Sequence, residues 1–191
     1  TLELYVDGNV DLSGWSVNVQ NNGSGFTNSI DLTSLGVIND AFVYITNNAA
    51  VLNSEFGISS NIIVDSSIES DGDEAFQVVD NTLSVLEKFG VENVDGTNTD
   101  WEHSDSFFYR QNGVVSNNGN FDASNWDFGD LNLLDNDGLC NSSNPFSDFV
   151  PFGAYNVNPT TKVQFIHNSA DPNLNLIDIY VDGNLEVDDI A

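Results

Sequence analysis

The chain has 191 residues, of which 40% are hydrophobic, so it holds enough apolar material for a core and is not expected to be disordered as a whole. It carries 30 acidic and only 3 basic residues, a formal net charge of −27. This charge excludes unaided binding to nucleic acid and argues against docking on anionic lipid, because both attract basic surfaces. Salt or bound divalent cations would relieve the self-repulsion, which suggests a marine or halophilic extracellular setting. The alternative is a solvated acidic face that only confers solubility.

The single cysteine, Cys140, excludes an internal disulfide and a structural zinc site built on thiolates. No apolar run approaches the roughly 20 residues that cross a bilayer. The sequence opens at Thr1 directly in a strand pattern. We therefore interpret the chain as a piece of a longer exported protein, with the export signal upstream of it.

Strand patterns dominate the chain, and helix signals are nearly absent. Alternating or β-branched runs end at Asx-rich turns, which suits a fold of short strands. The stretch 83–89 fits both a helical turn and a strand. The predicted strands, in chain order, are 2–6, 15–19, 41–46, 62–64, 75–79, 107–109, 161–166 and 177–181. Their number and spacing predict an all-β sandwich or barrel.

Two further features concern the organisation of the chain. Residues 135–160 hold three of the four prolines among Asn, Ser and Asp, so we interpret them as a linker or extended segment whose scattered aromatic residues pack against something. Residues 4–10 and 179–185 echo each other around an Asp-Gly pair. Two short matches do not make a repeat array, so they predict two separate strand–Asp-Gly hairpins.

The first part of the chain resembles the bacterial form of the lamin tail domain. It opens with a strand and the sequence Asp-Leu-Ser-Gly-Trp at 11–15. The later matching stretches, in the order of that family, are 32–35, 42–46, 71–78, 85–90, 95–102, 105–107, 109–110 and 124–126. The resemblance covers residues 1–134 and implies an immunoglobulin-like β-sandwich.

The end of the chain resembles the start of a DUF4397 domain, a β-rich family of secreted and surface proteins. The matching residues are 163–172 and 177–183. Residues 161–191 are therefore expected to be an incomplete domain, a C-terminal β-hairpin fragment. Two strands are marginal alone, so we expect this fragment to pair with an edge strand of the sandwich or with a neighbouring chain.

Acidic clusters at turns make Ca²⁺ the cofactor to consider, because this ion prefers oxygen ligands. Asp71 and Asp73 are one candidate pair, in a turn that also holds Glu74, and Asp135 and Asp137 are another. A third stretch, 93–102, has EF-hand spacing, but the first ligand position holds an apolar valine. The alternative is that these Asp-Gly sequences make turns without metal. Neither family resemblance implies a metal site.

No reaction is evident in the sequence, and we expect no enzyme. His103 and Asp105 would share one face of a strand, but the chain has no Gly-x-Ser-x-Gly elbow for a nucleophile. Paired carboxylates arise by chance among so many acids. Trp101 and Trp126 lie in loop-like contexts and are candidate ligand contacts, whereas a tryptophan in a sandwich of this kind commonly belongs to the core.

These observations suggest a non-catalytic extracellular or cell-surface module for adhesion, spacing or targeting within a larger exported bacterial protein. Its expected partners are other domains of that protein and a cell-surface protein or glycan. The alternative is an accessory domain of a secreted hydrolase, a nuclease or phosphatase, whose catalytic domain lies outside this chain. The near absence of basic residues means that DNA binding is not carried over from nuclear lamin tails.

Overall fold

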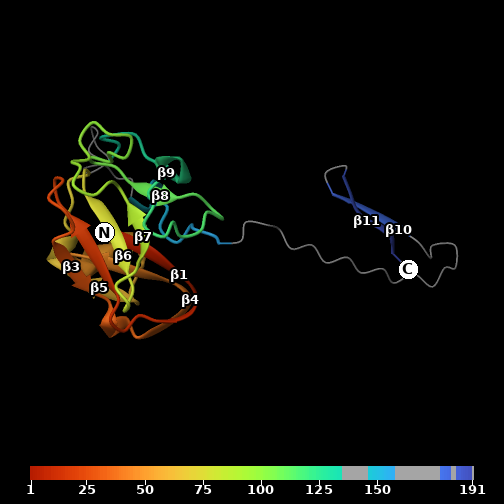
Figure 1. The fold of residues 1–191 in the computed structure, drawn as a ribbon, viewed down its shortest axis with the longest axis horizontal. Helices are drawn as coiled ribbons and strands as arrows, with labels where there is room; N and C mark the ends of the chain where they lie inside the picture. Colours follow the sequence, from red (N-terminus) through yellow and green to blue (C-terminus); the bar gives the residue numbers. More distant parts are fainter. Residues whose placement is uncertain (135–145, 158–176, 182–183, 191) are drawn as a thin grey trace. The chain divides into compact units, whose positions relative to one another are not determined.

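The computed structural model describes residues 1–134, 146–157, 177–181 and 184–190. The chain divides into two compact units, Thr1–Pro159 and Thr160–Ala191, which are treated separately below. The described residues form a mostly β structure with several sheets and one short α-helix (Figure 1). The all-β expectation is therefore confirmed at the level of a β-rich fold.

The first sheet of unit 1 has three strands in the order β1-β4-β5. Its strands are β1 (Leu2–Asp11), β4 (Val37–Thr46) and β5 (Ile62–Val64). β1 and β4 are antiparallel, whereas β4 and β5 are parallel. The parallel pair needs a crossover connection, and this connection contains the α-helix.

The second sheet has four antiparallel strands in the order β3-β2-β6-β7. They are β2 (Ser16–Gln20), β3 (Asn28–Asp31), β6 (Ala75–Val79) and β7 (Val85–Phe89). Alternation is clearest on β2, whose two valines are fully buried. Of the ambiguous stretch 83–89, residues 85–89 form β7 and pair with β6, whereas Leu83 lies in the turn before the strand with a φ of +66°.

Buried side chains of both sheets belong to one hydrophobic cluster. A small third sheet, β8 (Phe108–Arg110) with β9 (Trp126–Phe128), adds aromatic rings to it. The rings of Phe89 and Phe108 stack with centroids 3.7 Å apart. These aromatic contacts hold β7 against β8 and β9, which follow it in the chain after a long connection with little regular structure.

The helix α1 (Ala49–Phe56) is absent from the sequence expectation. Asn48 caps it, because its side-chain oxygen accepts hydrogen bonds from the N–H groups of Ala50 and Val51. Gly57 ends it in the left-handed conformation. Both signals are present in the sequence, but the helix is only eight residues long and its apolar pattern is weak.

One turn prediction is wrong. Asp7-Gly8 does not close a hairpin, because β1 continues through it and pairs with β4 on both sides of an irregularity between Val6 and Asn9. Gly8 has a φ of +77°, and its N–H donates to the carboxylate of Asp40, 2.7 Å away. The positive φ of Gly8 therefore belongs to a bulge-like irregularity within a long strand and not to a hairpin turn.

Residues 146–157, here called the strap, pack on the first sheet. The ring of Tyr155 lies 5.7 Å from that of Tyr5, and the ring of Phe152 lies 4.8 Å from that of Phe56. The N–H of Gly153 donates to a Glu3 carboxylate oxygen at 2.7 Å. The aromatic residues of the expected linker therefore pack against β1, β4 and α1, and this part of the segment belongs to unit 1.

In unit 2, β10 (Ile177–Val181) and β11 (Asn184–Ile190) form an antiparallel pair in which Val181 is opposite Asn184. The strand pair predicted around the second of the two echoing stretches, 179–185, is therefore present. The expected strand 161–166 lies outside the described residues. Pairing of this fragment with another sheet edge stays a prediction.

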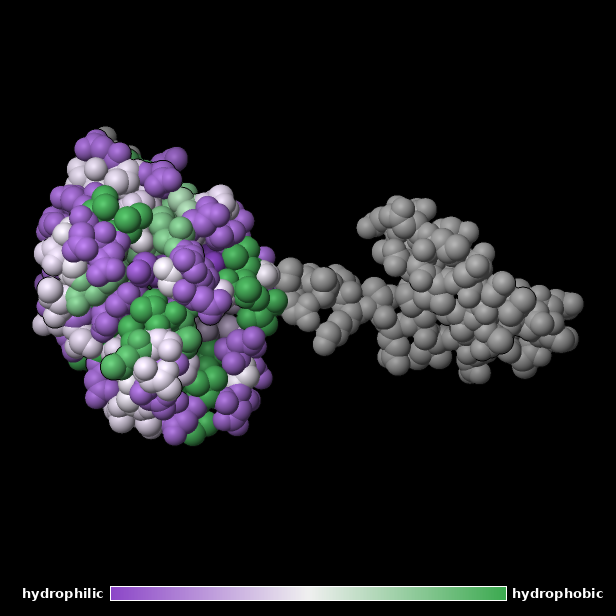
Figure 2. Space-filling view, in the orientation of Figure 1, coloured by the Kyte–Doolittle hydropathy of each residue, from purple (hydrophilic) through white to green (hydrophobic). Residues whose placement is uncertain are grey.

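The face of unit 1 seen in Figure 2 is a mosaic in which hydrophilic residues surround separate apolar patches. Among the described residues, no helix has the length and apolar character needed to cross a membrane.

The described residues also contain four short 3-10 helices: η1 (Thr33–Leu35), η2 (Ser66–Ile68), η3 (Ala123–Asn125) and η4 (Phe146–Asp148).

Candidate cation site

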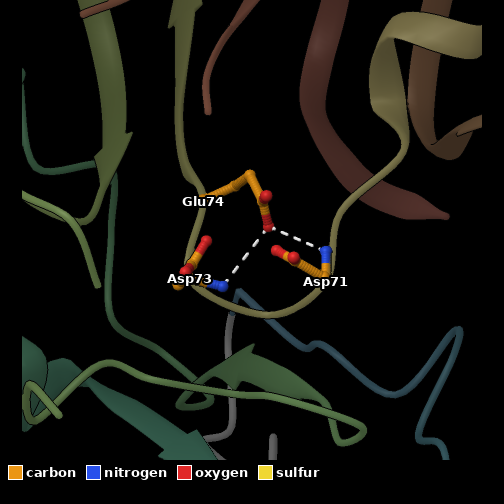
Figure 3. A group of neighbouring side chains, drawn as sticks. All are labelled: Asp71, Asp73 and Glu74. Atoms are coloured by element: carbon orange, nitrogen blue, oxygen red, sulfur yellow. Dashed lines mark hydrogen bonds between the residues drawn. The ribbon is translucent and has the colours of Figure 1, made fainter. Parts of the chain in front are cut away.

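Three carboxylates converge in the loop that leads from η2 into β6 (Figure 3). Asp71 is exposed, whereas Asp73 is 9% and Glu74 is 3% exposed. One carboxylate oxygen from each side chain can be chosen so that all three lie within 4.8 Å of one another. Asp73 and Glu74 are buried because β6 starts immediately after them and runs through the hydrophobic cluster.

Glu74 holds this loop in shape. Its Oε2 accepts hydrogen bonds from the N–H groups of Asp71 and Gly72, each at 3.1 Å, and of Asp73 at 3.3 Å. The hydroxyl of Ser70 donates to the same oxygen. Three successive N–H groups and a hydroxyl thus surround one charged oxygen, and the loop folds around its own carboxylate.

Asp73 is only half satisfied. Its Oδ2 accepts a hydrogen bond of 2.9 Å from the hydroxyl of Thr97. Its Oδ1 is buried and has no hydrogen-bond donor among the described residues. A buried charged oxygen without a partner is costly, so this atom marks a position where a positively charged group would be stabilising.

The neighbouring charges change the proton affinities of the two aspartates. Contact with the Glu74 carboxylate raises the pKa of Asp71. Burial raises the pKa of Asp73, and the charges of Asp71 and Asp95 raise it further, against the opposing hydrogen bond from Thr97. Both directions mean that the fully ionised cluster is disfavoured unless a cation balances it.

A second loop lies directly against the first. The N–H of His103 donates to the carbonyl of Gly72 at 2.7 Å, and the N–H of Gly96 donates to the carbonyl of Asp73 at 3.2 Å. Gly72 has a φ of +107°, and a Cβ there would lie 2.2 Å from the Cα of Ser104. Glycine is required at this position because backbone approaches backbone. We call the contact between loops 70–74 and 95–104 the loop seam.

The donor set fits a hard divalent cation. Carboxylate oxygens on a flexible loop suit Ca²⁺, which takes six to eight oxygens in adaptable geometry, better than Mg²⁺, which requires a near-ideal octahedron. Because Glu74 Oε2 already accepts four hydrogen bonds, this oxygen has little capacity left for an ion. The aspartates would thus supply the principal protein ligands, and water would complete the shell.

The other predicted site residues have different positions. Trp101 is 1% exposed and belongs to the hydrophobic cluster, so its ring offers no surface to a ligand. Trp126 is half-buried, and the guanidinium of Arg110 lies over its ring at 4.3 Å. One face of this ring is therefore covered by a side chain of the same unit. Asp135 and Asp137 lie outside the described residues.

The residues considered for catalysis and for EF-hand spacing form turns. His103 is buried, and its Nδ1 lies 3.2 Å from the carbonyl of Trp101. Asp105 has a φ of +47°, so the two residues do not share a strand face as expected. Asp95 and Glu102 accept hydrogen bonds from the N–H groups of Thr97 and Asn98, at 2.9 and 2.7 Å. Their carboxylates thus close local turns.

Sequence reasoning identified the aspartates but missed two residues that complete their surroundings. Glu74 was recognised only as a third acid in the turn, although an acid placed after Asp-Gly-Asp can fold back onto the preceding N–H groups. Thr97 was considered only as part of the EF-hand-spaced stretch 93–102, because no local pattern shows that its hydroxyl reaches Asp73 across 24 positions of the chain. Comparisons of the sequence with protein-family models, with curated proteins and with solved structures found no match.

Proposed function

We propose that this chain is a non-catalytic extracellular or cell-surface β-sandwich module, reinforced by a Ca²⁺ ion bound at Asp71 and Asp73. One observation carries the proposal: a buried, unpartnered carboxylate oxygen of Asp73 lies in a group of three converging acids. A proton or a cation can relieve such an arrangement. At neutral pH a cation is the more effective, because it balances more than one carboxylate at once.

The composition supports the same setting. Extracellular Ca²⁺ sites commonly work at dissociation constants of about 10⁻⁴–10⁻³ M, where few protein ligands suffice. A chain with a net charge of −27 also gains from the salt and divalent ions found outside cells. The module would then space, target or attach neighbouring domains of an exported protein.

The resemblance to bacterial lamin tail domains supports an immunoglobulin-like arrangement of the two sheets. The motif order in the sequence and the shared hydrophobic cluster are consistent with such a sandwich. The resemblance of residues 161–191 to a secreted and surface family supports the same location. On this proposal the chain's partners are other domains of the same protein and surface proteins or glycans.

Thermal unfolding of the full chain tests the cation site. We expect a rise in Tm on adding millimolar CaCl₂ to protein in EDTA at fixed high KCl, and a smaller rise with MgCl₂. Asp73→Asn should abolish the Ca²⁺-specific rise, because it removes the charge beside the unpartnered oxygen. Asp130→Asn is the matched control, since Asp130 is exposed and lies outside the acidic group.

Terbium provides a direct binding measurement. A Cβ on Gly96 would lie 2.6 Å from both the Asp73 carbonyl oxygen and the ring of Trp101, so the indole is adjacent to the site. Tb³⁺ bound there should emit on tryptophan excitation and be displaced by Ca²⁺. Emission of equal strength from wild type and Asp73→Asn would overturn the proposed site.

A further inference from the structure

We infer that the cation at Asp71 and Asp73 regulates the loop seam: its binding locks loop 95–104 against loop 70–74, and its removal releases that loop. This inference rests on the cation site proposed above and adds a regulatory consequence to it. The loop concerned is part of the long connection between β7 and β8.

The seam depends on few interactions. Between the two loops the structure has two backbone hydrogen bonds, from Gly96 to Asp73 and from His103 to Gly72, and the side-chain bond from Thr97 to Asp73. Two of these three bonds end on Asp73. Whatever stabilises or displaces Asp73 therefore acts directly on the second loop.

Like charges meet at this seam. Thr97 lies between two carboxylates, because its hydroxyl donates to Asp73 and its N–H donates to Asp95, both at 2.9 Å. Asp71 and Glu74 add negative charge on one side of the seam. These carboxylates are close enough to repel one another across the seam, because part of their surroundings is protein rather than water. A divalent cation at Asp73 converts this repulsion into attraction for both loops.

The buried ring of Trp101 gives the locking a structural consequence. Trp101 lies in the second loop, is 1% exposed, and contacts Phe89 edge-on with ring centroids 6.0 Å apart. When the seam is closed, this ring completes the hydrophobic cluster beside β7. Release of the loop would loosen that packing without requiring the two main sheets to separate.

Amide hydrogen exchange of the full chain, followed residue by residue by NMR, tests the inference. The amides of Gly96 and His103 donate across the seam, so both should exchange at least about tenfold more slowly in saturating CaCl₂ than in EDTA. The amide of Asn118, in the connection between β8 and η3, donates to the carbonyl of Leu86 on β7 and is the internal control. Its exchange should change much less under conditions where local opening dominates.

Thr97→Val provides a matched variant, because it removes the hydroxyl bond to Asp73 and keeps all three carboxylates. It should still bind Tb³⁺ but lose most of the Ca²⁺-dependent protection at Gly96. Thr82→Val is the control, since it also removes a hydroxyl bond to an aspartate, the 2.7 Å bond from Thr82 to Asp80, but within the exposed turn between β6 and β7.

The outcomes separate the two proposals. Sensitised Tb³⁺ emission that depends on Asp73, together with unchanged exchange at Gly96 and His103, would overturn the locking and leave the cation site intact. Absence of Asp73-dependent emission would overturn both. The wild-type comparison needs no variant to fold, so the locking can be refuted even where Thr97→Val is unstable.

Discussion

Replacing Glu74 with alanine should destabilise unit 1 by about 3 kcal/mol, even in EDTA. The Oε2 of Glu74 accepts three backbone N–H groups and the Ser70 hydroxyl, and two of those N–H groups belong to buried residues, Gly72 and Asp73. Hydrogen bonds to a charged group contribute about 1.5–3 kcal/mol each. Water does not readily replace the two hydrogen bonds from buried N–H groups, so their loss lowers the free energy of unfolding by roughly 3–6 kcal/mol. Removing the Glu74 charge also relieves its repulsion with Asp71 and Asp73, which offsets about 1–2 kcal/mol of that loss.

The assay is urea unfolding at high KCl with EDTA, followed by tryptophan fluorescence. For a domain of this size the loss corresponds to a fall in Tm of about 6–12 °C. Glu74→Gln keeps an acceptor oxygen and should lose less than alanine does. Glu92→Ala, at an exposed side chain with one weak ion pair, should change stability by no more than about 0.5 kcal/mol. A loss below about 1 kcal/mol for Glu74→Ala would refute the view that this carboxylate organises the loop.

Three further predictions concern other parts of unit 1. Gly72→Ala should cost more than about 3 kcal/mol in urea unfolding, because its φ is +107° and the added Cβ meets the Ser104 backbone; a mild loss would mean that the loops separate easily. Asn48→Ala should lower the free energy of unfolding by about 1 kcal/mol in the same assay, because it removes the cap of α1. An Asn48→Asp variant keeps a capping oxygen and should retain most of the stability that the cap contributes. Burial raises the pKa of Glu3 above its ordinary value of 4.5, so the folded state binds this proton more tightly than the unfolded chain. This group therefore adds stability as pH falls from neutral through the raised pKa of Glu3 toward 4.5, and Glu3→Gln should flatten that part of the Tm–pH curve; an unchanged slope would contradict it.

Much of the strand content could be predicted from the sequence because alternation is a local signal. The stretches 62–64, 75–79 and 177–181 coincide with β5, β6 and β10. β3 and β9 were missed because, unlike β5, they hold at most one β-branched residue and are defined by their partner strands. The Asp7-Gly8 sequence predicts a turn from local preference alone. The pairing of β1 with β4 on both sides of it keeps this stretch within one long strand.

The candidate site was partly predictable. The local sequence places Asp71 and Asp73 in one turn, and turn chemistry alone would bring their carboxylates close. The burial of Asp73 and the single hydrogen bond of its carboxylate depend on loop 95–104, more than twenty residues away. No local sequence pattern predicts this contact between the two loops. Trp101 shows the same limit, because its sequence surroundings are those of a loop while its ring lies in the core.

The strap determines where this unit can be cut. A fragment that ended at residue 134, the boundary suggested by family resemblance, would lose the rings of Phe152 and Tyr155 and leave the aromatic surface around Tyr5 and Phe56 bare. Uncovered apolar surface of that kind promotes self-association. Recombinant fragments intended to stay monomeric should therefore extend to residue 159, the end of the first compact unit, and insoluble behaviour of shorter clones would reflect a missing cover rather than a defective fold.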